Sequence, residues 1–557
     1  MIAYKHVSKI IVALTAIAVT LCFLAVMFAD TLSEAMGGST VRMEYETALF
    51  DTDEPISVNI IMDEDDWNEM LKNAMTEVYY VCDVEINGIT VKNVAIRPKG
   101  NTSLSAIAMD PDTDRYSLKL EFDHFVKGQT CYGLDKLILN NNYADATNMK
   151  EAIIYDMYQY LGADASLYNY AKVSVNGEYW GVYLALEAVE ESFMLRNFGT
   201  QDGELYKPDS MEMGGGNSSK SDDKGAPSFG GGGFDFSNMP GMGDFDMSNM
   251  PDMGSFDFGD MPNKDSAEAP FEDSSEDKDS KPSPGGGGFP GGGGGFSFDN
   301  GGANLNYTDD DLDSYSTIWD GEVTGTSKAD HKRVVTALKN ISEGTDIEEY
   351  LDVDNVLKYM AVHIFSVNMD SLSGSMAHNY YLYEYDGKLN IFPWDYNLSL
   401  GGMSMGGGSD RTSVVNDAID TPFSGTQFFN ALLENEEYLA KYHEYLDMLV
   451  EEYVNGGRFD EVYSRIRSQI DSLVEEDPTA FYNYDEYETA AETLYETIKL
   501  RAESIKGQLD GTIPSTDEGQ RNSNALIDAS HIDIKSMGTF NMGEGDSGDD
   551  FRKGMRK

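Results

Sequence analysis

Residues 363–402, HIFSVNMDSLSGSMAHNYYLYEYDGKLNIFPWDYNLSLGG, decide the fold of this chain. Apolar residues at helical spacing over 356–367 predict a helix, and the small polar residues after them predict a loop. The Asp386-Gly387 pair between two aromatic and apolar runs is a strong signal for a two-residue turn. The stretch therefore predicts a helix, a loop and a β-hairpin over 379–394, followed by a second loop.

Polar side chains occupy both loops of this unit. Asp370 precedes the predicted hairpin, Asn379 opens it, and Asp395 follows its second strand. Protein kinases place a catalytic base and two metal ligands in a similar order, although Asn379 lies farther from Asp370 than in ordinary kinases. Asp370 is thus a candidate catalytic base, and Asn379 and Asp395 are candidate Mg²⁺ ligands. The alternative is that all three are loop residues whose side chains bond local backbone.

The chain is strongly acidic. Its 557 residues carry 40 Lys and Arg against 97 Asp and Glu, a formal net charge of −57. A field of this sign repels nucleic acid, so no nucleic-acid partner is expected. Strong acidity also keeps a secreted protein soluble, which is the alternative reason for it.

Residues 1–30 predict a membrane anchor. Lys5 and Lys9 precede an apolar run over 10–29, which at about 20 residues is long enough to span a bilayer. Acidic residues follow the run, so the remaining chain is expected outside the cytoplasm. No clear small-residue cleavage site follows, which favours an uncleaved anchor over a signal peptide. The expected location is therefore membrane-anchored and extracytoplasmic.

Composition divides the rest of the chain into parts. Asn-Gly turns at 87–88 and 176–177 predict hairpins in the first half, and long amphipathic runs predict three packed helices over 426–509. A Gly- and Met-rich segment cannot bury enough apolar surface to offset ordering its backbone, so it is expected to be disordered. The expected parts are a linker (31–45), a β-rich part (46–210), the disordered insert (211–305), a helical part (306–510) and a loose tail (511–557).

Two cysteines lie beyond the predicted anchor, Cys82 and Cys131. They could pair outside the cell, or each could be a buried thiol. Their spacing matches no zinc motif.

The stretch RPKGNTSLS at 97–105 predicts a polar loop between two strands. Backbone N–H groups of such a loop can bind phosphate oxygens. The candidate nucleotide-binding residues of this loop are Arg97, Gly100, Asn101 and Ser103.

Two lysines outside the loop could reach a nucleotide phosphate. Lys119 lies in the next predicted strand, as the strand lysine of kinases does, and Lys207 lies in a later short strand. The alternative for Lys119 is a solvent-facing lysine on an alternating strand. Glu151, on a helix predicted over 147–161, could pair with a phosphate-bound lysine or be a surface acid. Glu187, at a strand end, is a further candidate of the same kind.

Several separate stretches resemble the CotH family of spore-coat kinases. They are VAIRPKGNTS (94–103), VNGEYWGVYLALEAVEESF (175–193), GELYKPD (203–209), NMDSLSGSMAHNYYLY (368–383) and IFPWDYNLSLGG (391–402). The resemblance covers roughly 48–210 and 308–510. It implies an α+β, atypical protein-kinase-like fold with an antiparallel β-rich N-lobe and a helical C-terminal lobe. It also implies ATP and Mg²⁺ as cofactors and transfer of the γ-phosphate to Ser/Thr of coat proteins.

The resemblance assigns roles to particular residues. Asp370 matches the catalytic aspartate and Asp395 the metal-binding aspartate, with Asn379 assisting the metal. Lys119 is the first choice for the nucleotide lysine and Lys207 the second. The chain departs from the family at Asn397, where a second acid is usual, and at Lys150, where arginine is usual.

Two functions fit these observations. The first is a kinase acting on a protein substrate, expected to be Ser-rich and basic because the chain is so acidic. The second is a surface or coat-assembly binding protein that uses the same fold without catalysis, since a fold does not determine a function.

Overall fold

The computed structural model describes residues 42–208, 303–374, 376–404, 411–421, 423 and 425–541. All of them belong to one compact unit. The predicted anchor at 1–30 and the Gly/Met-rich insert, apart from 303–305, lie outside the described residues. Within the described ranges, no helix combines the length and the apolar character needed to cross a membrane.

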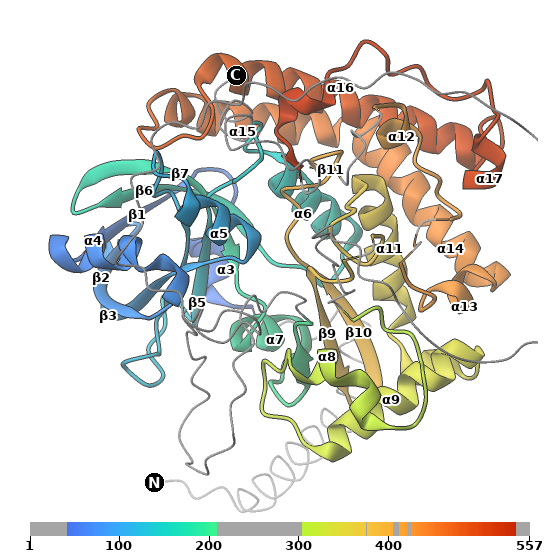
Figure 1. The fold of residues 1–557 in the computed structure, drawn as a ribbon, viewed down its shortest axis with the longest axis horizontal. Coiled ribbons are helices and arrows are strands. Elements are labelled where there is room, and N and C mark those ends of the chain that lie inside the picture. Colours follow the sequence, from blue (N-terminus) through green and yellow to red (C-terminus); the bar gives the residue numbers. More distant parts are fainter. Residues whose placement is uncertain are drawn as a thin grey trace, which may run out of the picture. The chain divides into compact units, whose positions relative to one another are not determined.

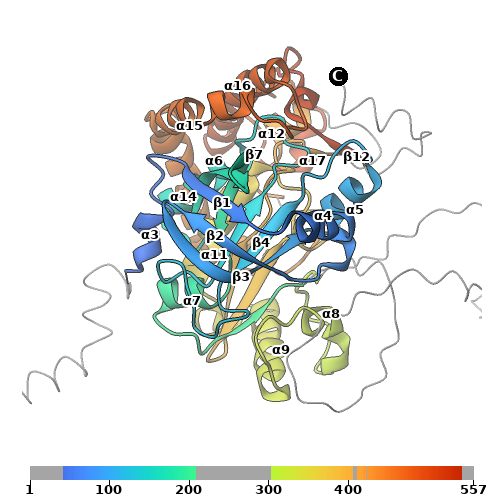
Figure 2. The same cartoon turned by 90° about the vertical axis from the view of Figure 1, so that its left-hand side faces the viewer.

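Strands of the first half close into a seven-stranded barrel (Figure 2). The order is β1-β2-β3-β4-β5-β7-β6, and all neighbours are antiparallel except β1 and β6, which run parallel with Val58 opposite Val173. Asn87-Gly88 and Asn176-Gly177 have positive φ at both positions, as type I′ hairpin turns require. The strands are β1 (Ile56–Ile61), β2 (Tyr80–Ile86), β3 (Ile89–Lys99), β4 (Ser117–Glu121), β5 (Lys136–Asn140), β6 (Tyr168–Val175) and β7 (Glu178–Glu187).

The barrel corrects the predicted fold class. The sequence predicted an atypical kinase-like fold with an antiparallel β-rich lobe, and this prediction is wrong, because the strands close into a barrel with one parallel pair. The predicted N-terminal transmembrane helix lies outside the described residues. The strands close on themselves through the parallel β1–β6 pair, whose residues lie far apart in the chain. Alternating hydrophobicity predicts that a strand exists but not which distant strand it pairs with, so the closure left no local signal.

Short helices lie before, between and after the barrel strands in the sequence. Asp63 caps helix α4 by accepting a hydrogen bond from the backbone N–H of Asp65, and Gly162 ends α6 in a left-handed conformation, φ 67°. These helices are α3 (Glu44–Ala48), α4 (Glu64–Lys72), η1 (Ala74–Thr76), α5 (Thr102–Met109), α6 (Lys150–Leu161) and α7 (Glu191–Phe198).

A three-stranded sheet, β10-β9-β8, lies among the later helices (Figure 1). Strand β8 (Glu204–Tyr206) precedes the insert and pairs with β9 (Tyr380–Tyr385), which forms the predicted hairpin with β10 (Lys388–Pro393). Chain segments on either side of the insert therefore share one sheet.

Helices make up most of the second half. They are η4 (Leu312–Tyr315), α8 (Ser316–Trp319), α9 (Lys328–Glu343), α10 (Ile347–Tyr350), α11 (Val353–Ser366), α12 (Arg411–Asn416), α13 (Asn430–Leu433), α14 (Glu436–Asp447), the π-helical η5 (Met448–Val454), α15 (Arg458–Glu475) and α16 (Tyr484–Leu509). Part of the tail expected to be loose is also ordered, as α17 (Asp517–Gln520), η6 (Ile534–Met537) and β12 (Phe540–Asn541). Strand β12 pairs with β11 (Met403–Ser404), close in sequence to Asp395.

Barrel strands contribute to two hydrophobic cores because their side chains alternate in direction. Leu137 and Leu139 of β5 belong to a cluster made by the barrel's own strands and its short helices. Ile138 between them belongs to a second cluster with helices α6, α11 and α14–α16. One face of the barrel wall therefore packs on the helical part. Both cysteines are free, buried thiols, so they do not pair.

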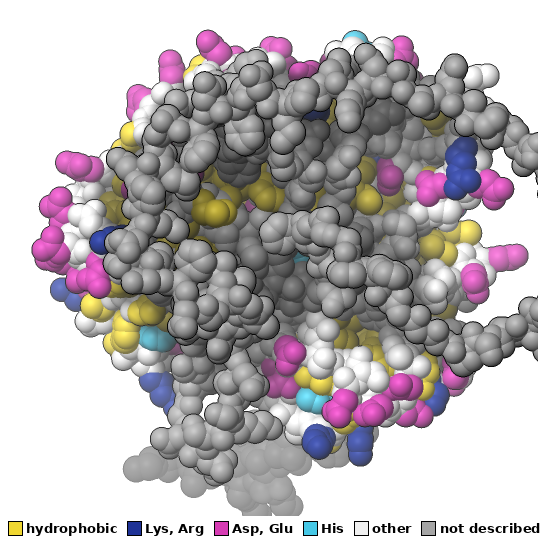
Figure 3. All heavy atoms as spheres, viewed as in Figure 1, with side chains coloured by type: hydrophobic (Ala, Val, Ile, Leu, Met, Phe, Trp, Pro, Cys, Tyr) yellow, Lys and Arg dark blue, Asp and Glu magenta, His cyan; other side chains and the backbone are white. Residues whose placement is uncertain are grey.

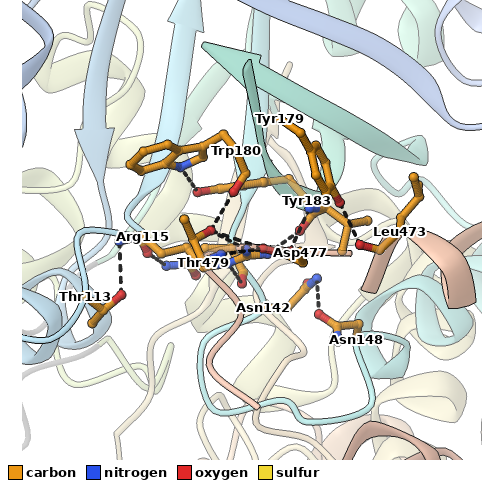
Figure 4. Close-up of polar contacts among 12 residues, drawn as sticks. Thr113, Arg115, Asn142, Asn148, Tyr179, Trp180, Tyr183, Leu473, Asp477 and Thr479 are labelled. Atoms are coloured by element: carbon orange, nitrogen blue, oxygen red, sulfur yellow. Dashed lines mark hydrogen bonds and ion pairs between the residues drawn. The ribbon is translucent and has the colours of Figure 1, made fainter. Parts of the chain in front are cut away.

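A buried ion pair also joins the barrel to the helical part (Figure 4). The Arg115 guanidinium lies 2.7 Å from the Asp477 carboxylate, which follows α15, and both side chains are almost fully buried. Asp477 also accepts a hydrogen bond from the backbone N–H of Val182 in β7 at 2.9 Å. Two charges buried this deeply require such a set of partners, and the pair therefore fixes how β7 meets α15.

Candidate active site

The loop after α11 holds Asp370 and Asn379 together. The Asn379 Nδ2 donates to the Asp370 carboxylate at 3.0 Å and to the Asp370 carbonyl at 2.9 Å. His378 Nε2 lies 2.9 Å from the other carboxylate oxygen. Because Asp370 uses the amide hydrogens of Asn379, the amide oxygen of Asn379 is left for another ligand.

Asp395 lies where β10 ends and within electrostatic reach of Asp370. Burial raises the pKa of its carboxyl group, and Lys99 is the strongest charge that opposes this. Among the described residues, none donates a hydrogen bond to the Asp395 carboxylate. A half-buried carboxylate without hydrogen bonds is suited to binding a cation.

Several residues of these two loops have a strained backbone with positive φ. Val367, Ala377, Asn379 and Asp395 have φ values of 47°, 48°, 56° and 62°, a region that residues with a side chain seldom occupy. Such conformations cost of order 1–3 kcal/mol each and cluster at functional sites. Two of the four are the predicted metal ligands.

Two lysines converge above Trp394. The Lys99 Nζ lies 5.5 Å from the centre of the indole ring and the Lys207 Nζ 5.7 Å from it, with Lys207 also 5.8 Å from the Tyr381 ring. Both charges act on Asp395. Burial lowers the pKa of Lys99 to about 8, with Asp395 the strongest opposing influence. The charge of Lys207 also lowers the pKa of Lys99, so the two ammonium groups lie within electrostatic reach of each other and are suited to binding an anion.

Sequence reasoning missed Lys99. The residues predicted instead were Arg97 and Gly100, which lie on both sides of this lysine in the same loop, and Lys119 in the next strand. A signal was available, because Lys99 stands at the end of strand β3, directly before Gly100.

Glu151 joins this group through Asn140. The side-chain oxygen of Asn140 accepts from Lys99 Nζ at 3.2 Å, and its Nδ2 donates to Glu151 at 2.9 Å. The backbone N–H of Tyr396 donates to the other Glu151 oxygen at 3.4 Å. Burial raises the pKa of Glu151 to about 8, and the charge of Asp395 adds to this rise. The first turn of α6 thus connects Lys99 to the segment that carries Asp395.

The predicted polar loop is a strand end, a two-residue turn and a helix. Gly100 has φ 124°, and a Cβ atom there would lie 2.8 Å from the Ser103 hydroxyl, so only glycine fits without strain. Asn101 precedes α5 and Ser103 lies in its first turn. This tight turn places both residues next to Lys99.

The remaining predicted residues lie in other clusters. Lys119 Nζ pairs with Glu190 at 2.7 Å, and Arg97, its cross-strand neighbour, pairs with Glu77. Glu187 is fully buried and pairs with Arg196 at 2.6 Å. The structure therefore brings together Asp370, Asn379, Asp395, Lys207 and Glu151, and gives Lys119, Arg97 and Glu187 other partners.

The donor atoms fit a hard cation such as Mg²⁺. No group of three or more His, Cys, Asp or Glu side chains that could hold a metal occurs within the described ranges. Mg²⁺ is usually bound through only one or two carboxylates, with phosphate and water supplying the other oxygens. The Asp395 carboxylate, which accepts no hydrogen bond from the described residues, and the Asn379 amide oxygen are donor groups of this kind.

Beneath the site, His363 in α11 gives a testable pH dependence. Burial lowers its pKa from 6.5 to about 3, so the folded protein takes up a proton later than the unfolded chain does. Between these pKa values the unfolded state binds more protons, and the free energy of unfolding should fall by about 1.4 kcal/mol per pH unit as the pH drops. Urea unfolding of wild type and His363→Asn from about pH 7 to pH 5 measures this difference in slope.

Thr336→Ala, a change at an exposed position without a titratable group, is the control and should keep the wild-type slope. Equal slopes for wild type and His363→Asn would contradict the prediction.

The protein consists of a barrel and a helical part, and their loops and strand ends carry the two carboxylates, the amide and the two lysines of the candidate site. Residues 96–232 and 275–505 match the family model described as CotH kinase protein, and the chain belongs to this family. Membership suggests a kinase, with ATP and a divalent metal as cofactors and a protein as substrate. A comparison with curated proteins found no match.

Proposed function

We propose that this protein transfers the γ-phosphate of ATP to a Ser or Thr hydroxyl of a protein substrate. One observation carries the proposal: Lys99 and Lys207 converge on Asp395, with Asp370 within electrostatic reach. Phosphoryl transfer depends mainly on positioning and on neutralising charge, and it needs this combination of cations, a metal ligand and a carboxylate.

Each residue has a role in this proposal. Lys99 and Lys207 bind phosphate oxygens, and Trp394 beneath them keeps the two ammonium groups in place. Asp370, held by His378 and Asn379, orients the attacking hydroxyl and accepts its proton. Asn140 and Glu151 hold Lys99 from the side of the barrel and α6.

Asp395 and the amide oxygen of Asn379 would hold Mg²⁺. Held there, the metal would supply positive charge that stabilises the negative charge developing during phosphoryl transfer. Asn397 stands where the family usually has a second acid. Its Nδ2 donates a hydrogen bond to the Tyr143 carbonyl at 2.8 Å and so stabilises the loop instead.

A basic protein is the proposed substrate class. Acidic side chains lie around much of the rim of the face shown in Figure 3, in keeping with the excess of 97 acidic over 40 basic residues. Complementary charge steers association. The association of the CotH family with the spore coat makes a basic, Ser-rich coat protein the first substrate to test.

The direct test is transfer of radiolabelled γ-phosphate from Mg–ATP to a basic, Ser-rich protein. Wild type should label it, and Asp395→Ala should not. Asp66→Ala, an exposed position on α4, is the matched control and should label like wild type. Equal labelling by wild type and Asp395→Ala would remove the kinase proposal and favour a binding protein without catalysis.

Replacing lysines one at a time tests which of them binds the nucleotide. Lys99→Met should raise the KM for ATP by about 10- to 100-fold, because one charge-assisted contact to phosphate is worth roughly 1.5–3 kcal/mol. Lys119→Met should change this KM by less than about 3-fold, because Glu190 already pairs with that ammonium. Steady-state kinetics at saturating protein substrate measures both. A larger rise in the KM for ATP with Lys119→Met than with Lys99→Met would mean that Lys119 binds the nucleotide.

A further inference from the structure

A chain of buried hydrogen bonds begins at His363 in α11. The imidazole is fully buried between the rings of Tyr359 and Phe423, with ring centres 5.2 and 5.6 Å away. Its Nδ1 lies 3.1 Å from the Tyr396 hydroxyl and its Nε2 lies 2.8 Å from the Ser373 hydroxyl. The ring thus contacts one residue from each of the two loops that carry the site's acids.

The direction of these hydrogen bonds follows from the donors available. Ser373 donates its only hydroxyl hydrogen to the Asn368 carbonyl at 2.5 Å, so it accepts from His363, and Nε2 carries the ring proton. The ring is neutral because burial lowers its pKa to about 3, so Nδ1 accepts from the Tyr396 hydroxyl. Tyr396 in turn accepts from Tyr158 at 2.5 Å. Every donor in this series of hydrogen bonds therefore has a partner.

Asn368 continues this chain to both acids. Its side-chain oxygen accepts from the backbone N–H of Asp370 at 3.2 Å, and its Nδ2 donates to the backbone carbonyl of Asp395 at 3.2 Å. Tyr396, the other partner of His363, directly follows Asp395. Both loops are therefore tied to one buried ring, although His363 touches neither carboxylate.

We propose that His363 is a positioning residue that sets the separation of Asp370 and Asp395. Through Ser373 and Asn368 it fixes the first loop, and through Tyr396 it fixes the second. This proposal rests on the proposed function, because the separation matters only if the two acids act on one substrate. Positioning contributes directly to phosphoryl transfer, where a misplacement of about 1 Å costs as much as 100-fold in rate.

The test separates the two contacts of the ring. His363→Gln can keep a donor near the position of Nε2, whereas His363→Asn keeps an acceptor near Nδ1 and loses the bond to Ser373. Ser373→Ala removes the same bond from the other side. We expect His363→Asn and Ser373→Ala each to lower kcat by about 10-fold or more, with the KM for ATP within about 3-fold of wild type. His363→Gln should recover most of that loss.

The double variant supplies the readout that a merely structural role would not give. Both changes break the His363–Ser373 hydrogen bond, and Ser373→Ala also removes the donation to Asn368. His363→Asn with Ser373→Ala should therefore lose no more kcat than the worse single variant. Multiplicative losses, or single variants that melt earlier but turn over like wild type, would overturn the proposal. Inactive wild type would instead defeat the proposed function itself, so the two failures are distinguishable.

A spectroscopic measurement supports the same test without turnover. In ¹⁵N spectra of histidine-labelled wild type at about pH 7, His363 should show a protonated Nε2 and an unprotonated Nδ1. A protonated Nδ1 would reverse the hydrogen-bond chain and overturn the proposal.

Discussion

If this protein is the proposed kinase, we expect Asp370→Asn to lower kcat for phosphate transfer by about 100- to 10,000-fold, the usual range for losing a general base. The substituted amide cannot accept the hydroxyl proton, and its NH₂ group would face either the Asn379 amide or His378, which now lie 3.0 and 2.9 Å from the carboxylate oxygens. Mg–ATP should bind nearly as before, since Lys99, Lys207 and Asp395 are unchanged. Single-turnover phosphate transfer and calorimetric titration with Mg–ATP measure the two quantities separately.

Asp66→Asn is the matched control, an exposed aspartate in the first turn of α4. It should retain both turnover and binding. If Asp370→Asn transferred phosphate at the wild-type rate, Asp370 would be only a loop residue and the base would have to be sought elsewhere.

Arg501→Met has the largest expected effect on stability, a loss of about 3–5 kcal/mol, as when one partner of a buried charged network is removed. The Arg501 guanidinium is fully buried in α16 and donates to the carbonyls of Ile364 and Phe365 at the end of α11. It also donates to the carbonyls of Val415 and Asp417. Methionine fills similar volume but leaves these buried carbonyls without their donor.

Urea unfolding at neutral pH measures this loss, with Arg521→Met as the exposed control. Arg501 holds the end of α11 directly before the Asp370 loop, so residual kcat should fall in the folded variant as well. A loss below about 1 kcal/mol would mean that the carbonyls find water or other donors.

Local signals in the sequence predicted the two-residue hairpin turns correctly. Asn87-Gly88, Asn176-Gly177 and Asp386-Gly387 all adopt the positive φ values that two-residue hairpins need. Each of these turns depends on residues within a few positions, which sequence patterns describe well.

Pairing between distant segments was not predictable in the same way. The parallel contact of β1 with β6 closes the barrel, and β8 pairs with β9 across the insert, yet neither leaves a pattern in its own strand. Predicted strands can therefore be correct while the sheet they form is not.

The candidate site shows the same division. Asp370 and Asn379 lie in one loop and are hydrogen-bonded to each other, but the choice between lysines required the structure. Lys99 and Lys119 lie on neighbouring strands, and only the position of Glu190 shows that Lys119 has another partner. Likewise, nothing in the sequence marks His363 as the residue that joins the two loops.

The most direct measurement is a crystal structure of the protein with Mg²⁺ and a non-hydrolysable ATP analogue. The account predicts phosphate oxygens within hydrogen-bond distance, about 3 Å, of the Lys99 and Lys207 ammonium groups. It also predicts the metal on Asp395 and the γ-phosphate facing Asp370. A nucleotide bound instead beside Lys119 and Glu190, with Asp395 left without metal, would contradict it.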